Sequence, residues 1–111
     1  MNIPLLRRIQ RQIDKAPERF AMGTATTETS CGTAFCIGGW ALALNGTKIK
    51  TIHDNGVVGA ADLLDINWKQ RSLLFWTHNW PKQFQALDGT PELPALAIAR
   101  IDHFIATEGR E

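Results

Sequence analysis

The sequence has no excess of charge of either sign. Its 111 residues include 12 basic and 11 acidic side chains, which give a formal net charge of +1 at pH 7. So small a net charge produces no global field that would steer the chain to nucleic acid or to an anionic membrane. Binding of that kind would require a local patch of charge.

The chain also lacks a long hydrophobic run. The apolar centre of its longest uncharged stretch, from Ala34 to Leu44, is far shorter than the roughly 20 residues that a membrane-spanning helix needs. The first residues, MNIPLLRRIQ, do not show the apolar stretch and small-residue cleavage site of a secretory signal. We therefore expect a cytoplasmic protein without a membrane segment.

Cysteine is scarce, with only Cys31 and Cys36 present. We expect both thiols to be free, because the cytosol keeps thiols reduced. If both residues are helical, their Cα atoms lie about 8.6 Å apart, beyond the roughly 7 Å limit for a disulfide. The histidines do not follow the cysteines at any spacing typical of zinc sites. The sequence predicts no metal site, and we assign no cofactor.

The clearest helical pattern covers residues 2–16. At 100° per residue, apolar and basic side chains separate onto opposite faces, which is typical of an amphipathic surface helix. The apolar face consists of Leu5, Leu6, Ile9, Ile13 and Ala16. Pro17 ends this helix or begins a further short turn, because proline lacks the N–H that a helix interior requires.

A second predicted helix, from Thr33 to Leu44, is apolar around its whole circumference and is therefore expected to be buried. Cys36 and Trp40 are assigned to its core-facing side. The adjacent glycines Gly38 and Gly39 cost a helix about 1.5 to 2 kcal/mol relative to alanine. We expect something to approach closely there, either a neighbouring helix, which we favour, or a ligand against the exposed backbone.

The remaining segments complete a helical fold. Residues 23–30 predict a loop. Residues 48–58 alternate polar and apolar side chains before Asn55-Gly56, a pattern that fits a small β-ribbon. An isolated hairpin of this size is marginal, so we expect a loop of extended character there, with or without a small ribbon. Short helices are predicted at 59–64 and, capped by Asn67, at 68–76, and a last helix ends near Thr107. The expected fold is all-α: one domain over residues 1–111, a compact bundle of four to five helices around a buried central helix at 33–44.

Several stretches together resemble a family of small uncharacterised bacterial proteins. They are Ala16–Phe20 with Met22, Cys31–Thr33 with Cys36-Ile37 and Gly39–Ala41, Leu74-Phe75, Trp80-Pro81, and Arg100–Ile105. The chain departs from that pattern at Gly38, where such proteins often have alanine, and in its short segment around 47–58. The resemblance implies a bacterial or phage source and a single small domain, and it brings no known activity.

Cys31 is the candidate nucleophile of a thiol-dependent enzyme. If the central helix begins near Ser30, Cys31 lies in its first turn, where the helix dipole stabilises a thiolate. His53 and His103 are candidate bases, and nothing in the sequence chooses between them. Asp102 does not orient His103, because consecutive helical residues point about 100° apart. The set is incomplete, so surface histidines are the favoured interpretation and the enzyme assignment stays open.

Binding to another protein, or to a second copy of the chain, is the leading functional hypothesis. Its weak candidate residues are Trp76, His78 and Trp80, together with Gly38 and Gly39. Aromatic side chains at a helix junction are common interface anchors, although burial in the core is the default for large aromatics.

Nucleic-acid binding is a further alternative. The basic face of the first helix carries Arg7, Arg8, Arg11 and Lys15. Four cations without a basic net charge or an accompanying motif are weak evidence, and a solvated face is the favoured interpretation.

Overall fold

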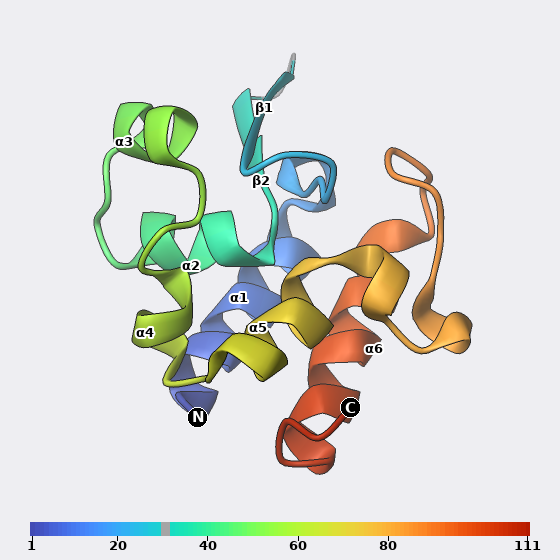
Figure 1. Ribbon diagram of the computed structural model, residues 1–111. Helices are drawn as coiled ribbons and strands as arrows, with labels where there is room; N and C mark the ends of the chain where they lie inside the picture. The colour runs from blue at the N-terminus through green and yellow to red at the C-terminus, as the bar shows by residue number, and fades with distance from the viewer. Residues whose placement is uncertain (30–31) are drawn as a thin grey trace.

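The computed structural model describes residues 1–29 and 32–111, which form six α-helices, three short 3-10 turns and one two-stranded sheet (Figure 1). The helices are α1 (Ile3–Lys15), α2 (Ile37–Leu44), α3 (Ile49–Asn55), α4 (Ala60–Leu64), α5 (Trp68–Phe75) and α6 (Leu93–Ala106). The turns are η1 (Pro17–Arg19), η2 (Thr77–Asn79) and η3 (Lys82–Phe84), and the strands are β1 (Thr26–Thr29) and β2 (Gly32–Phe35). The chain is 59% helical, so the all-α expectation holds coarsely and omits the sheet.

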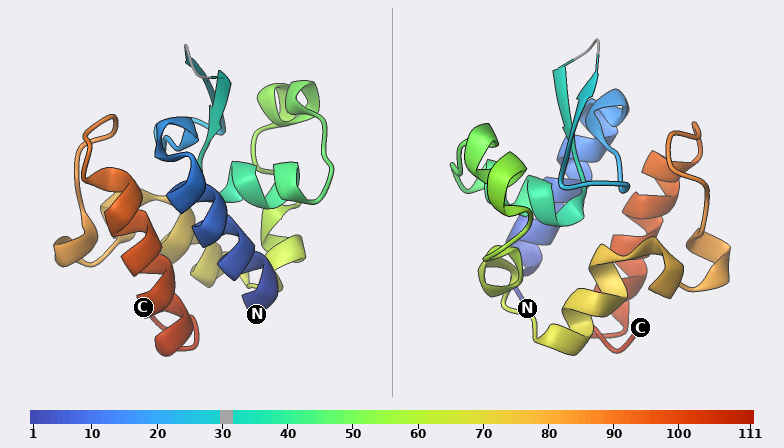
Figure 2. Two further views of the ribbon diagram at one scale, coloured as in Figure 1. Left: turned by 180° about the vertical axis from the view of Figure 1, so that it is seen from behind. Right: turned by 45° about the horizontal axis from the view of Figure 1, so that its top comes forward.

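Helices α1 and α6 lie side by side (Figure 2). The predicted apolar face of α1 is confirmed, because Leu6, Ile9 and Ile13 are fully buried. Asn2 caps the helix, its side chain accepting a hydrogen bond from the backbone N–H of Leu5. The apolar face thus meets α6 and supplies much of a single hydrophobic core that the other elements share.

The predicted helix at 33–44 is wrong in its first third. Residues Gly32–Phe35 form a strand, and the helix begins only at Ile37. Thr33 and Phe35 favour strands, and both faces of β2 are covered, which leaves Ala34 1% exposed. A strand buried on both faces shows no alternation of polar and apolar residues, so its sequence resembles that of a buried helix.

The segment 23–30, predicted as a loop, contains β1, which pairs antiparallel with β2 from Thr26↔Phe35 to Thr29↔Gly32. Threonine is a strand-forming residue, and this preference outweighs the small, polar composition that suggested a loop. The resulting hairpin projects from the helices (Figure 1).

The extended loop expected at 48–58, with or without a small ribbon, is also wrong. Residues Ile49–Asn55 form helix α3, in which Ile52 is buried and Ile49 is 47% exposed. The Asn55-Gly56 pair ends this helix, with Gly56 at φ 67°, instead of turning a hairpin. A left-handed glycine serves either purpose, so the dipeptide does not distinguish them.

Both ends of α5 are satisfied by side chains. The predicted cap Asn67 is confirmed: it forms a capping box with Gln70. At the other end, three side chains donate to consecutive carbonyls: Asn79 to Ser72 at 2.9 Å, Arg100 to Leu73 at 3.1 Å, and Trp80 to Leu74 at 2.8 Å. Orphan carbonyls at a helix end need such partners, so the Trp80-Pro81 and Arg100–Ile105 stretches have a structural role.

Arg19 joins the hairpin to the helices. Its Nε donates to the carbonyl of Thr33 at 3.0 Å, and its guanidinium lies 5.4 Å from the ring centroid of Trp40. Trp40 in turn donates from its indole nitrogen to the Arg19 carbonyl at 3.1 Å and packs edge-on against Phe35.

The described helices include none long and apolar enough to cross a membrane.

Candidate functional site

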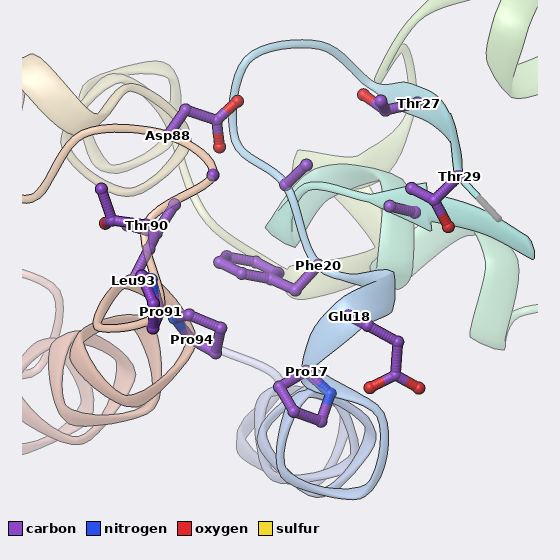
Figure 3. Close-up of a pocket in the computed structure, with 13 residues that line it drawn as sticks. Pro17, Glu18, Phe20, Thr27, Thr29, Asp88, Thr90, Pro91, Leu93 and Pro94 are labelled. Atoms are coloured by element: carbon purple, nitrogen blue, oxygen red, sulfur yellow. The ribbon is translucent and has the colours of Figure 1, made fainter. Parts of the chain in front are cut away.

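One cavity, which we call the Phe20 cavity, opens between η1, one face of the hairpin and the turn before α6 (Figure 3). Its volume is about 500 Å³, within the roughly 300–1,000 Å³ typical of ligand sites. Its apolar lining consists of Pro17, Phe20, Ala21, Ala34, Pro91, Leu93 and Pro94, and its polar lining includes Glu18, Thr27, Thr29, Asp88 and Thr90. An open, largely apolar cavity of this size can accommodate a large side chain or a small molecule.

The walls of the Phe20 cavity follow from local sequence. Pro17 ends α1 and starts η1, after which Phe20 is extended and forms a parallel bridge with Phe35. Thr27 and Thr29 are two residues apart on β1, so both point to the same face of the hairpin. Sequence reasoning interpreted the prolines only as helix boundaries, and it missed this site because three distant segments form it.

Two carboxylates line the Phe20 cavity, and they differ in their bonding. Asp88 accepts hydrogen bonds from the backbone N–H groups of Met22 and Gly23 at 2.9 and 3.0 Å. Glu18 is exposed and has no ion-pair partner among residues 1–29 and 32–111. Glu18 is therefore the carboxylate that is available to an incoming cation.

A smaller cavity of about 310 Å³, the Trp76 cavity, lies beside the first one. Its lining consists of Met22, Gly23, Thr24, Ala25, Cys36, Gly56, Val57, Phe75, Trp76, Thr77 and His78. The segment held by Asp88 lines this cavity on its other side, so the Asp88 contacts separate the two cavities. The predicted candidates Trp76 and His78 come together here with Cys36.

Cys36 is buried, as predicted, but it is not inside the helix. It is the N-cap of α2, and its Sγ accepts a hydrogen bond from the backbone N–H of Gly39 at 3.3 Å. Burial raises the pKa of this thiol, and the hydrogen bonds from Gly39 and Gly38 lower it by less. Cys36 is a free thiol whose protonated form is favoured, which makes it a poor nucleophile.

Cys31 lies outside the described residues. Because α2 begins at Ile37, the helix dipole invoked for Cys31 acts instead on Cys36. The two candidate bases lie on different elements: His53 is exposed on α3 and lines a shallow cavity with Thr26 and Glu28, whereas His103 on α6 packs against Phe84 with ring centroids 5.3 Å apart. The structure does not bring these two histidines together.

The protein's own chain approaches both central glycines. A Cβ at Gly38 would lie 2.9 Å from the Val57 side chain and 3.1 Å from Phe75. A Cβ at Gly39 would lie 2.5 Å from the backbone carbonyl oxygen of Ala25. The expected neighbouring helix accounts for part of this approach, because Phe75 is the last residue of α5, and loop residues Val57 and Ala25 make the rest.

The three candidates at the helix junction differ in exposure. Trp80 is 2% exposed and belongs to the core, the role that the sequence favoured. Trp76 is 39% exposed, with the guanidinium of Arg71 lying 5.2 Å from its ring centroid, and His78 is exposed. Of these three candidates, only Trp76 and His78 are exposed.

The basic face of α1 is partly occupied by internal contacts. Arg7 forms an ion pair with Asp102 and also donates to Gln10 at 2.7 Å. Arg8 donates to the Leu44 carbonyl at 3.4 Å, which leaves Arg11 and Lys15 as exposed cations without an ion pair among the described residues. Two such cations form a small patch for phosphate groups.

Arg100 is the one fully buried charged side chain among the described residues. Its guanidinium lies 5.6 Å from the ring centroid of Phe104, and its Nε and Nη1 form no hydrogen bond in the described part of the chain. Burial lowers the pKa of Arg100 to about 10, although the charge of Glu111 opposes that shift. Arg100 stabilises the end of α5 but is not accessible as a surface site.

Among residues 1–29 and 32–111, no group of three or more His, Cys, Asp or Glu side chains is placed to hold a metal ion. No protein family, curated protein or solved structure matches this chain. The resemblance to small bacterial proteins therefore stays a prediction.

Proposed function

We propose that the protein acts as a binding module that holds a segment of a protein in the Phe20 cavity. The observation that carries this proposal is the open, apolar cavity of about 500 Å³ itself. Apolar side chains that remain accessible in a folded protein favour association, because burying them against a partner removes them from water. The cavity offers the exposed rings of Pro17 and Pro91 for such contacts.

The lining also supports binding by a preformed site. Pro17, Pro91 and Pro94 have fixed φ angles and lose little conformational freedom when a ligand is bound. Leu87, which precedes Asp88 at the cavity, is 80% exposed and extends the apolar surface. A protein segment, which is larger than the cavity, would cover both Leu87 and the cavity.

The proposal is tested by selecting random peptides displayed on phage against the full chain, followed by titration of the selected peptides. In Thr27→Trp, a large ring on the cavity face of β1 fills the site, so the Kd should rise at least roughly tenfold. The matched control is Thr26→Trp, which places the same ring on the opposite face of β1, beside α3. Peptides that bind both variants as tightly as the parent chain, or a selection that yields none, would refute the proposal.

A further inference from the structure

Trp68, the first residue of α5, is 78% exposed. Among the large hydrophobic residues that the structure describes, Trp68 is the only aromatic one that is more than half exposed. Trp76, by comparison, is 39% exposed and lies against Arg71. The capping box of Asn67 and Gln70 fixes the start of the helix and therefore the direction of this side chain. An exposed indole on a rigid helix end is a typical interface anchor.

Lys69 follows Trp68 directly and is also exposed. It takes part in no ion pair within residues 1–29 and 32–111. The pair therefore presents a large apolar ring next to an available cation. The Phe20 cavity presents the complement, an apolar hollow next to the available carboxylate of Glu18.

We propose that the occupant of the Phe20 cavity is a second copy of this chain, whose Trp68 enters the cavity while its Lys69 pairs with Glu18. This inference rests on the proposed function, because it uses the same site. It commits to one partner on two grounds: the cavity volume of about 500 Å³ is large enough for an indole, and the charges beside the ring and beside the cavity are opposite.

The geometry makes this contact head to tail. α5 begins near the N-terminus of the chain, whereas the hairpin that lines the cavity projects at the other end (Figure 1). The two complementary surfaces are different parts of the chain, so each copy can use one surface on each of two neighbours. Association then produces a ring or an open chain, not a two-fold dimer that buries the same patch twice.

The first test is sedimentation of the full chain over a range of concentrations. The mean mass should rise with concentration, and Trp68→Ala and Thr27→Trp should each weaken association at least about thirtyfold, as loss of a central aromatic anchor does. Both positions are exposed, so circular dichroism should show an unchanged fold. Trp76→Ala, which removes another exposed tryptophan, is the control and should leave the association unchanged.

A mixture of the two weakened variants gives the sharper result. Trp68→Ala keeps an intact cavity and Thr27→Trp keeps an intact Trp68, so equal amounts should form a dimer of one copy of each and grow no further. Glu18→Lys or Lys69→Glu alone should weaken association roughly tenfold by placing like charges together, and the double variant should restore it.

A parent chain that stays monomeric at millimolar concentration would overturn this inference. So would a mass unaffected by the Trp68 and Thr27 variants, a mixture that forms no dimer, or a charge exchange that restores nothing. If selected peptides still bind the Phe20 cavity in that event, the proposed function stands with a different partner. If no peptide binds either, both proposals fail.

Discussion

Helices α1, α5 and α6, which we call the helical base, differ from the Phe20 cavity in how their polar side chains are bonded. In the helical base, polar side chains bond to one another and to helix ends. Around the Phe20 cavity, the Glu18 carboxylate is exposed to solvent. Gln10, for example, donates to the Ile98 carbonyl at 2.8 Å and to Asp102 at 2.9 Å. Such contacts fix how two helices pack. The helical base therefore supplies stability, and the cavity supplies an accessible surface.

The two regions share one hydrophobic core, to which Phe20 and Phe35 also belong, and specific contacts join them. Arg19 links the hairpin to Trp40, Asp88 links the turn before α6 to Met22 and Gly23, and Gly39 admits the carbonyl of Ala25. Changes in the base should therefore cost global stability. Changes at the cavity should act locally.

The largest effect is expected from Arg100→Ala in the base. It empties a fully buried volume and removes the donor to the Leu73 carbonyl, so the free energy of unfolding should fall by about 3 to 4 kcal/mol. Urea denaturation measures it. Arg71→Ala is the control, because Arg71 also lies over an aromatic ring but is partly exposed, and it should cost less than about 1 kcal/mol. Equal losses for both variants would contradict a special role for burial.

Gly39→Ala, at the junction, should have the next largest effect. The added methyl group would meet the Ala25 carbonyl oxygen at 2.5 Å, so we expect a loss of about 2 to 3 kcal/mol in spite of alanine's better helix propensity. In Gly38→Ala, the added methyl group meets the Val57 side chain, which can move. Alanine's better helix propensity should then limit the net loss in the free energy of unfolding to about 1 kcal/mol. Thermal unfolding of the two variants compares them, and a reversed order would show that the loop yields more easily than Val57.

Asp88→Ala tests the wall between the two cavities. It removes two hydrogen bonds at an exposed site, so the free energy of unfolding should fall by about 1 kcal/mol. The amide hydrogens of Met22 and Gly23 should exchange faster with solvent while those of α1 keep their rates. Asp14→Ala is the matched control, because Asp14 is exposed and its side chain forms no hydrogen bond or ion pair within residues 1–29 and 32–111. Faster exchange throughout α1 would mean that Asp88 supports the whole fold.

The smallest effect is expected from Asp102→Asn in the base. The hydrogen bond from Gln10, followed by that from Arg7, lowers the pKa of Asp102 below its ordinary value of 3.8. A lowered carboxylate pKa stabilises the folded state above pH 3.8, and that contribution is lost as the pH falls through the folded-state pKa. At neutral pH, the free energy of unfolding of the parent chain should exceed that of the variant by no more than about 1 kcal/mol, because the Arg7–Asp102 pair is half exposed. Denaturation from pH 7 to pH 2 should show the two curves converging in acid, and a constant difference would contradict this origin.

Spacing along the chain predicted some features well. The amphipathic pattern of α1 and the Asn67 cap depend on neighbours within one or two helical turns, and both are confirmed. The predictions were wrong for the strand at 32–35 and for helix α3. The apolar run at the strand fits a buried helix equally well, and the short alternating run at α3 fits an extended segment equally well. Only their tertiary partners, β1 for the strand and the core around Ile52 for the helix, choose between them.

The sequence by itself determined that the chain has an amphipathic first helix and a buried segment around Cys36 and Trp40, because periodicity and side-chain apolarity are local properties. Tertiary structure alone decided where function can reside. Pro17, Thr27 and Pro94 line one cavity although about two thirds of the chain separates the first from the last, and α2 begins late enough to make Cys36 its cap. Sites of this kind depend on how the chain folds back on itself, which no short stretch of sequence records.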